Sequence, residues 1–151
     1  MECSQTDFVI NNLSKTLIRK EYALSRKFEE GLKTRKEVLG ETYVNESFEN
    51  ATSFDKPFQE FITESAWGGV WNRGPLDRKT KSIITLSVLI ALRSDTEIAL
   101  HTKGAVHNGV SPEEILALLI HSSVYAGVPA SVSALKTVKK VLMEMGKLPS
   151  D

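Results

Sequence analysis

The sequence predicts an all-α protein, a compact bundle of about six helices. Apolar residues recur at helical spacing along most of the chain, and no segment alternates with period two over enough length to form a convincing strand. Capping residues and glycines divide the apolar segments into separate helices. The chain has 151 residues, of which 41% are hydrophobic and 25% charged, as in one ordinary globular domain.

The first predicted helix begins near Tyr22 and ends at Gly40, since glycine readily terminates a helix. Its apolar stripe recurs every four positions and consists of Leu24, Phe28 and Leu32. Residues 1–20 show no such pattern and are interpreted as an N-terminal extension. The remaining residues 21–148 are predicted to form a single helical domain.

Ser53 is a candidate cap for a second helix, in which Pro57 lies close enough to the start to be tolerated. Gly68 and Gly69 are expected to end it. Its apolar residues are Phe54, Phe58, Phe61, Ile62 and Ala66.

Asp77 is the N-cap candidate of a long third helix that has almost no polar face. The apolar residues that indicate this are Ile83, Ile84, Leu86, Val88, Leu89, Ile90 and Leu92. Such a helix is expected at the centre of the fold.

Three further helices are predicted in the C-terminal part. Asp95 is the N-cap candidate of a helix over 96–107, which Asn108-Gly109 closes. Ser111-Pro112-Glu113-Glu114 combines a serine cap, proline at the first helical position and glutamate at the third, which predicts a capping box. That helix runs to about Ala126, and the last one extends from Pro129 to Gly146.

Charge and cysteine content limit the possible partners and compartment. With 19 basic and 19 acidic residues the formal net charge is zero, so no global attraction to nucleic acid or to an anionic membrane is expected. One cysteine, Cys3, can form neither an internal disulfide nor a metal site by itself. No signal peptide and no apolar run long enough to span a bilayer is apparent. A cytoplasmic protein is expected.

Glu97 and His101 are the candidate catalytic residues. Four positions apart on a helix, they project from one face, and a carboxylate beside an imidazole is expected to raise its pKa. This spacing is common on solvated helices. However, His101 lies between Ile98 and Ala105, which mark one apolar stripe, so its ring is expected to point toward the interior or a cleft.

Trp67, Trp71 and Arg73 surround the glycine pair and are candidates for binding a flat anionic ligand. Indole rings offer apolar walls, and a guanidinium binds a carboxylate through two parallel hydrogen bonds. A core tryptophan pair with a surface arginine explains the same pattern equally well.

Arg78, Lys79 and Lys81 open the third helix, where the helix dipole disfavours cations. A bound anion would offset that cost. For Lys79 a solvated first turn with Asp77 as counter-ion is the favoured interpretation, whereas Arg78 and Lys81 are retained as candidate carboxylate ligands.

A series of motifs spans about residues 28–140. They are Arg35, Val38-Leu39-Gly40, Ala66-Trp67-Gly68, Trp71, Arg73, Leu76, Thr80, Ser82-Ile83, Glu97-Ile98-Ala99-Leu100-His101, Asn108-Gly109-Val110, Glu113-Glu114-Ile115 and Tyr125-Ala126-Gly127-Val128-Pro129-Ala130. Taken together, these motifs resemble the carboxymuconolactone decarboxylase family.

The resemblance implies an alkylhydroperoxidase-like helical subunit in a homo-oligomer, commonly a hexamer arranged as a trimer of dimers. It also implies cofactor-independent decarboxylation of 4-carboxymuconolactone, a small anionic lactone, to 3-oxoadipate enol-lactone in protocatechuate degradation. No metal or cofactor is expected. On this interpretation His101 donates the proton, Glu97 orients it, and Ser82 or Ser94 assists the developing oxyanion. The tryptophans form a dry wall beside carboxylate-binding cations.

Two departures from related sequences bear on the chemistry. Related peroxidases carry a Cys-x-x-Cys pair where this chain has Ser94 and Glu97, so thiol redox chemistry is excluded for its own residues. Lys81 stands where arginine is expected, which leaves an enzyme acting on another unsaturated lactone or β-keto acid as one alternative. A non-catalytic oligomeric member of the fold is the other.

Overall fold

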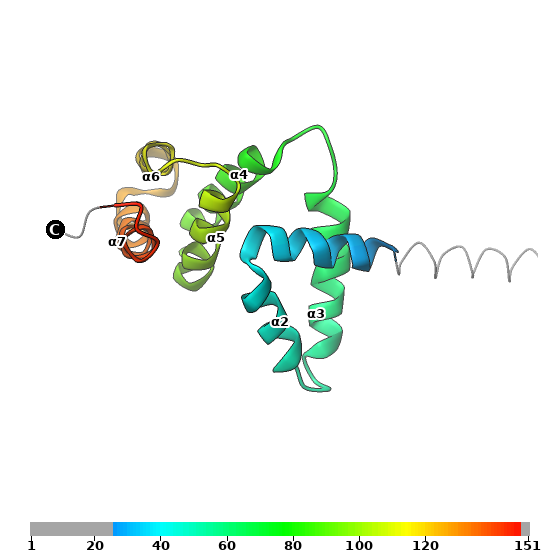
Figure 1. Ribbon diagram of the computed structural model, residues 1–151. Coiled ribbons are helices and arrows are strands. Elements are labelled where there is room, and N and C mark those ends of the chain that lie inside the picture. The colour runs from blue at the N-terminus through cyan, green and yellow to red at the C-terminus, as the bar shows by residue number, and fades with distance from the viewer. Residues whose placement is uncertain (1–25, 149–151) are drawn as a thin grey trace, which may run out of the picture. The chain divides into compact units, whose positions relative to one another are not determined.

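The computed structural model describes residues 26–148, which are helical apart from short connections (Figure 1). This confirms the predicted all-α class, and within that range there is no strand. The N-terminal extension, Cys3, Tyr22 and Leu24 lie outside the described residues. The described helices form two compact units. Of the described residues, unit 1 comprises 26–34 and Asn50–Asn72, and unit 2 comprises Arg35–Glu49 and 73–148. A single domain over residues 21–148 stays a prediction.

Unit 1 contains the start of a helix that covers residues 26–39, followed later by α3 (Lys56–Ile62) and the π-helix η1 (Thr63–Trp71). The predicted helix start at Ser53 is wrong, because α3 begins at Lys56 with Asp55 preceding it. Phe54, Phe58 and Phe61, expected to form the apolar stripe, are 94%, 61% and 62% exposed.

Gly68 does not end a helix, because η1 continues through it to Trp71. A Cβ atom at Gly68 would collide with the backbone carbonyl oxygen of Lys27, and one at Gly31 would collide with the carbonyl oxygen of Thr63. These two glycines therefore let two helix backbones cross in close contact. The glycine pair was interpreted as a stop signal, whereas Gly68 serves packing.

Unit 2 begins with the end of the first helix, which stops at Gly40 as predicted, with a φ angle of 96°. Helix α2 (Glu41–Glu49) follows immediately and was not predicted from the sequence. Its mean hydropathy is low and it buries only Val44, so it lacks a continuous apolar stripe.

The remaining helices follow the predicted order closely. They are α4 (Arg78–Leu92), α5 (Asp95–His107), α6 (Pro112–Ala126) and α7 (Val128–Glu144). Asp77 caps α4 by accepting a 2.7 Å hydrogen bond from the Thr80 backbone N–H. The Ser111–Glu114 capping box of α6 is present in both directions. The predicted cap of α5 is off by one residue, since Ser94 precedes the helix and Asp95 is its first residue.

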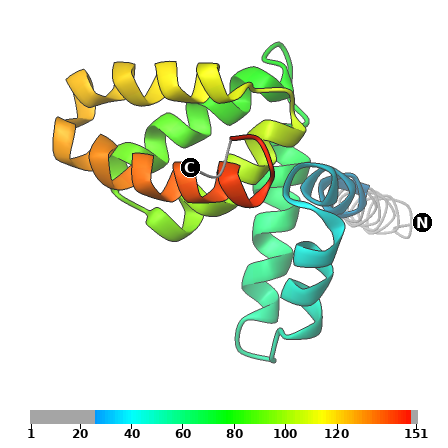
Figure 2. The same cartoon turned by 60° about the vertical axis from the view of Figure 1, so that its left-hand side comes forward.

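The core of unit 2 lies among these four helices. Helix α5 packs against α4 and α7, and α6 packs against α4 and α7, with α6 and α7 running side by side (Figure 2). The buried hydrophobic cluster consists of Leu86, Ile90, Ile98, Ala105, Val110, Ile115, Leu118, Leu119, Ala134, Val138 and Leu142. Helix α5 is thereby fixed on two sides, which makes it a rigid support for polar side chains on its other faces.

Helix α4 is less buried than its sequence predicts. Leu86 and Ile90 are 1% exposed, but Ile84, Val88 and Leu92 are 46%, 51% and 70% exposed. The helix therefore contributes one face to the core of unit 2 and leaves another apolar face uncovered. None of the helices in the described range is long and apolar enough to cross a membrane.

Candidate active site

Helix α5 carries both predicted catalytic residues on one face. The His101 Nε2 atom lies 3.8 Å from Glu97 Oε2, and the two side chains are 13% and 48% exposed. The imidazole is thus sheltered while the carboxylate reaches toward solvent. The predicted orientation of the His101 ring, away from bulk water, agrees with this geometry.

The expected rise in the pKa of His101 is wrong in direction. Burial lowers the pKa of His101 from 6.5 to about 4, because desolvation penalises the imidazolium form. The carboxylate, itself half exposed and not in hydrogen-bond contact, does not compensate for this penalty. His101 is consequently neutral at physiological pH before a substrate binds.

Ser94 lies at the tight connection that starts α5. Arg93 adopts a left-handed conformation with φ 55°, and the Ser94 backbone N–H donates to the Leu89 carbonyl oxygen at 3.1 Å. The Ser94 carbonyl oxygen accepts the first helical hydrogen bond, from Ile98 N–H, at 2.8 Å. Ser94 thus stands one turn before Glu97, and its hydroxyl does not cap the helix.

The cations at the start of α4 already have partners within unit 2. Arg78 forms a 2.6 Å ion pair with Glu37, and Lys81 Nζ donates to the Arg73 carbonyl oxygen at 2.6 Å. Lys79 pairs with Glu114 at 2.8 Å, so its surface role was predicted correctly, although with a different counter-ion. These ion pairs are half exposed and hence weak enough to exchange for a ligand.

Ser82 is buried at 2% exposure, and both capacities of its hydroxyl are used. It donates to the Arg78 carbonyl oxygen at 3.0 Å and accepts from Asn108 Nδ2 at 2.9 Å. Ser82 thus ties the start of α4 to the end of α5. This arrangement leaves Ser94 as the better placed of the two predicted serines.

The two tryptophans belong to unit 1, whereas the other predicted site residues belong to unit 2. Trp67 and Trp71 stack with ring centroids 4.8 Å apart and are 5% and 9% exposed. Arg73 is exposed. Their burial matches the alternative of a packed tryptophan pair with a surface arginine, and a ligand-binding role for the indoles stays a prediction.

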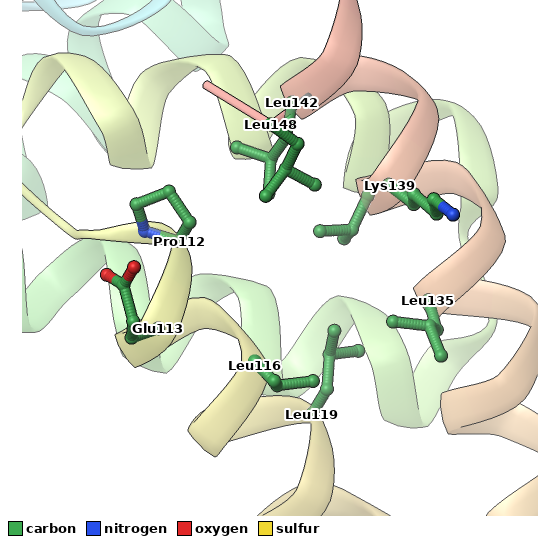
Figure 3. A pocket seen from close by; sticks show the side chains of 9 residues that line it. Pro112, Glu113, Leu116, Leu119, Leu135, Lys139, Leu142 and Leu148 are labelled. Atoms are coloured by element: carbon green, nitrogen blue, oxygen red, sulfur yellow. The ribbon is translucent and has the colours of Figure 1, made fainter. Parts of the chain in front are cut away.

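Two cavities of unit 2 differ in chemical character. One, of about 450 Å³, is lined by Glu97 and by polar residues of α2, α5 and α7, including Tyr43, Thr96, Lys103 and Thr137. The other, of about 270 Å³, lies between α6, α7 and Leu148 and is almost entirely apolar (Figure 3). Only the first contains a predicted site residue, so it is the cavity adjoining the candidate active site.

Arg35 is one of the sequence motifs, but the sequence predicts no role for it. Arg35 is 3% exposed, and its charge interacts with that of Glu97. An arginine within a helix that precedes Val38-Leu39-Gly40 is usually a surface residue, and the spacing from position 35 to position 97 carries no signal of proximity. Only the fold brings the two together.

Comparison with known proteins points to one group of enzymes. The model of the carboxymuconolactone decarboxylase family matches residues 56–140. The chain is 46% identical over 120 residues to nitrosuccinic acid decarboxylase npaB of Metarhizium robertsii, covering 80% of this chain and 84% of that protein. It is 42% identical over 124 residues to 4-carboxymuconolactone decarboxylase of Acinetobacter baylyi, covering 82% and 92%.

These matches define an all-helical enzyme that releases carbon dioxide, a carboxy-lyase. Within that class the chain belongs to the carboxymuconolactone decarboxylase family. The resemblance inferred from the sequence motifs is thereby confirmed. Because the two relatives bear the names of different substrates, family membership leaves the substrate of this chain open.

Proposed function

We propose that this enzyme decarboxylates a small dianionic acid without a cofactor, with 4-carboxymuconolactone as its first candidate substrate and 3-oxoadipate enol-lactone as the product. The observation that carries the proposal is the identity of 42% across 92% of a 4-carboxymuconolactone decarboxylase. The sheltered His101 beside Glu97 supplies a proton-transfer group of the kind this reaction needs. The step belongs to the degradation of aromatic acids through protocatechuate.

The chemistry of the substrate supports a reaction without a cofactor. In 4-carboxymuconolactone the departing carboxylate is attached to a ring carbon conjugated through a carbon–carbon double bond to the lactone carbonyl. When the bond to CO2 breaks, its electron pair moves into that carbonyl and forms a dienolate, which then accepts one proton on carbon. The substrate is its own electron sink, so the protein has to bind a dianion, stabilise an oxyanion and deliver a proton.

His101 is the proposed proton donor. The negative charge of the bound substrate is proposed to make the imidazole take up the proton that it then donates. Burial keeps the pKa of the imidazole at about 4, so it is neutral when substrate arrives. A dianion bound nearby raises the imidazole pKa, because negative charge favours the imidazolium form. Substrate binding is then coupled to proton uptake, and the charged His101 protonates the dienolate.

Arg73 is the proposed first ligand of the substrate carboxylates, with Arg78 or Lys81 as the second. The Arg73 side chain is exposed, and the ion pair of Arg78 with Glu37 is 42% and 39% exposed. Exchanging a surface carboxylate for a substrate carboxylate costs little. Ser94 is the proposed hydrogen-bond donor to the developing oxyanion, and Trp67 and Trp71 are proposed to exclude water.

Nitrosuccinic acid is a second candidate substrate, favoured by the 46% identity to a nitrosuccinic acid decarboxylase. Loss of CO2 from the carbon that bears the nitro group leaves a nitronate, in which the nitro group takes the electron pair. Protonation on carbon completes the reaction. Both candidates are dianions with a built-in electron sink, so the same residues suit either one.

The enzyme is also proposed to act as a homo-oligomer, a hexamer arranged as a trimer of dimers. In support, α4, α6 and α7 expose apolar side chains at helical spacing, namely Ile84, Val88, Leu92, Leu116, Ile120, Val124, Val128 and Val132. Contiguous exposed apolar surface on a single chain is typical of association sites. Light scattering of the purified protein gives the subunit number, and a monomeric mass at micromolar concentration would refute the association.

The proposed activity is tested by following the ultraviolet absorbance of enzymatically generated 4-carboxymuconolactone and, separately, of nitrosuccinate. Turnover of one over the other identifies the substrate, and the absence of turnover on both refutes the proposal. The variant His101→Gln is expected to lower kcat by about 100-fold or more, the loss typical of a general acid. His107→Gln, at the end of the same helix, is the matched control. Full activity of His101→Gln would remove His101 from the mechanism.

A further inference from the structure

Lys81 lies in the first turn of α4, where a positive charge needs a compensating partner. The N-terminal end of a helix carries a partial positive charge of its own, which disfavours cations there. The other two cations of this turn form ion pairs with carboxylates. The ammonium of Lys81 instead donates a 2.6 Å hydrogen bond to the backbone carbonyl oxygen of Arg73. A bound anion is therefore not needed to account for a lysine at this position.

This hydrogen bond ties the connection before α4 back onto the helix. Donor and acceptor are eight residues apart, and residues 72–77 between η1 and α4 are all exposed. The side chain of Asp77 holds the last residue of the connection by capping α4. Lys81 holds its second residue, Arg73, through a short hydrogen bond from a charged donor, which is a strong kind of hydrogen bond. The main chain of Arg73 is thus anchored to α4 by a side chain.

The start of α4 is fixed in turn to the helix that carries the candidate catalytic residues. Ser82, next to Lys81, accepts a 2.9 Å hydrogen bond from the side chain of Asn108 at the end of α5. His101 lies about two turns before Asn108 on the same helix. Helices α4 and α5 also pack against each other in the core. The anchor of Arg73 therefore belongs to the same framework as His101.

We propose that Lys81 is a positioning residue, which does not bind the substrate itself but holds the Arg73 segment so that the guanidinium of Arg73 meets a substrate carboxylate. Arg78 is then the second carboxylate ligand, since its ion pair with Glu37 is half exposed and can exchange for the substrate. The inference rests on the proposed function, in which Arg73 binds the substrate.

Two physical arguments support this role. An arginine on a restrained segment loses less conformational freedom when it binds a ligand, so a restraint present in the free protein strengthens binding. A single carbonyl oxygen needs one point-like donor and makes no use of a planar fork. A lysine at position 81, where the family resemblance leads one to expect arginine, is therefore sufficient to hold the Arg73 carbonyl.

A double-mutant cycle on the substrate identified above separates positioning from direct binding. Lys81→Met alone is expected to raise KM about 5- to 10-fold with kcat changed less than about twofold, because only substrate binding is weakened. In the Arg73→Ala background, Lys81→Met is expected to change kcat/KM by less than about twofold, since Lys81 acts through the side chain that is missing there. Arg78→Ala in that background is expected to lower kcat/KM by the same factor as it does alone, as for an independent ligand.

Nitrogen-15 relaxation of the backbone amides in residues 73–77 tests the structural part without substrate. Order parameters of about 0.8 are expected in the unaltered protein, and Lys81→Met is expected to lower them below about 0.6, the range of flexible backbone. Lys79→Met is the matched control, because it removes a neighbouring cation that pairs with Glu114. It is expected to leave both the order parameters and KM unchanged.

Two results would overturn the proposal. One is an unchanged order parameter over residues 73–77 in a folded Lys81→Met protein. The other is an equal rise in KM on Lys81→Met with and without the Arg73 side chain, which would make Lys81 a ligand in its own right. If Lys81→Met does not fold, Lys81→Ala decides by the same criteria. If neither candidate substrate is turned over, the proposed function fails, and the order parameters still decide whether Lys81 holds the Arg73 segment.

Discussion

The low pKa of His101 makes the stability of the fold depend on pH in a defined window. Above pH 6.5 the imidazole is neutral in both folded and unfolded chains, so it contributes no pH dependence. As the pH falls below 6.5, His101 becomes protonated in the unfolded chain but stays neutral in the folded protein, so the folded state loses stability. The loss stops growing near pH 4, where the buried ring is protonated as well. Lowering the pKa from 6.5 to about 4 corresponds to about 3 kcal/mol, at about 1.36 kcal/mol per unit.

Urea denaturation at pH values from about 7.5 to 4 measures this effect when the unaltered protein is compared with His101→Gln. Carboxylates contribute the same pH dependence to both proteins, and any difference in packing between histidine and glutamine adds an offset that does not vary with pH. The difference in unfolding free energy should therefore change by about 3 kcal/mol between pH 6.5 and 4, with the histidine protein losing more. A difference that stays constant with pH, or a His101 titration midpoint near 6.5 by nuclear magnetic resonance, would show that the ring is not desolvated.

Three further substitutions test the fold. Gly68→Ala is expected to destabilise the protein by about 1 to 3 kcal/mol, because the added carbon would overpack against the backbone of Lys27. Gly69→Ala is the control and should be neutral or stabilising, because its added carbon meets only ordinary contacts. Thermal unfolding compares the two variants, and equal effects would contradict the close helix crossing at Gly68. Ser111→Ala should cost about 1 kcal/mol in urea denaturation through loss of the capping box, and Ser111→Thr should retain most of the stability. Leu86→Ala should cost about 2 to 5 kcal/mol, and a cost below about 1 kcal/mol would place Leu86 outside the core.

The sequence predicted helices α4 to α7 well because their boundaries depend on local interactions. Asp77, Ser111 and Gly40 act on their own turns, so their effect does not require knowledge of the fold. Helix α2 was missed because it buries little beyond Val44 and lacks a clear apolar stripe. Gly68 was misinterpreted because a glycine that permits a close helix crossing looks, in sequence, like one that ends a helix.

The candidate site was predicted only where its residues share one helix. Glu97 and His101 are four positions apart, so helical geometry alone placed them together. The sign of the His101 pKa change was missed, since the degree of burial depends on how α5 packs and not on the spacing of the two residues. The interaction of Arg35 with Glu97 joins two helices distant in sequence, and no local pattern encodes it.

On the proposed mechanism, one site can accept acids as different as 4-carboxymuconolactone and nitrosuccinate. Before a substrate binds, the positive charge of Arg35 and the negative charge of Glu97 partly cancel, and burial keeps His101 neutral. The charge of the imidazole is then decided by the ligand, because a bound dianion supplies the negative potential that stabilises the imidazolium. On this mechanism the site responds to the charge of the acid and to its capacity to accept an electron pair, properties that 4-carboxymuconolactone and nitrosuccinate have in common. A monoanionic analogue with the same electron sink should raise the pKa of His101 less than a dianion does. At saturating concentration its turnover should therefore be slower, because a smaller fraction of His101 is protonated.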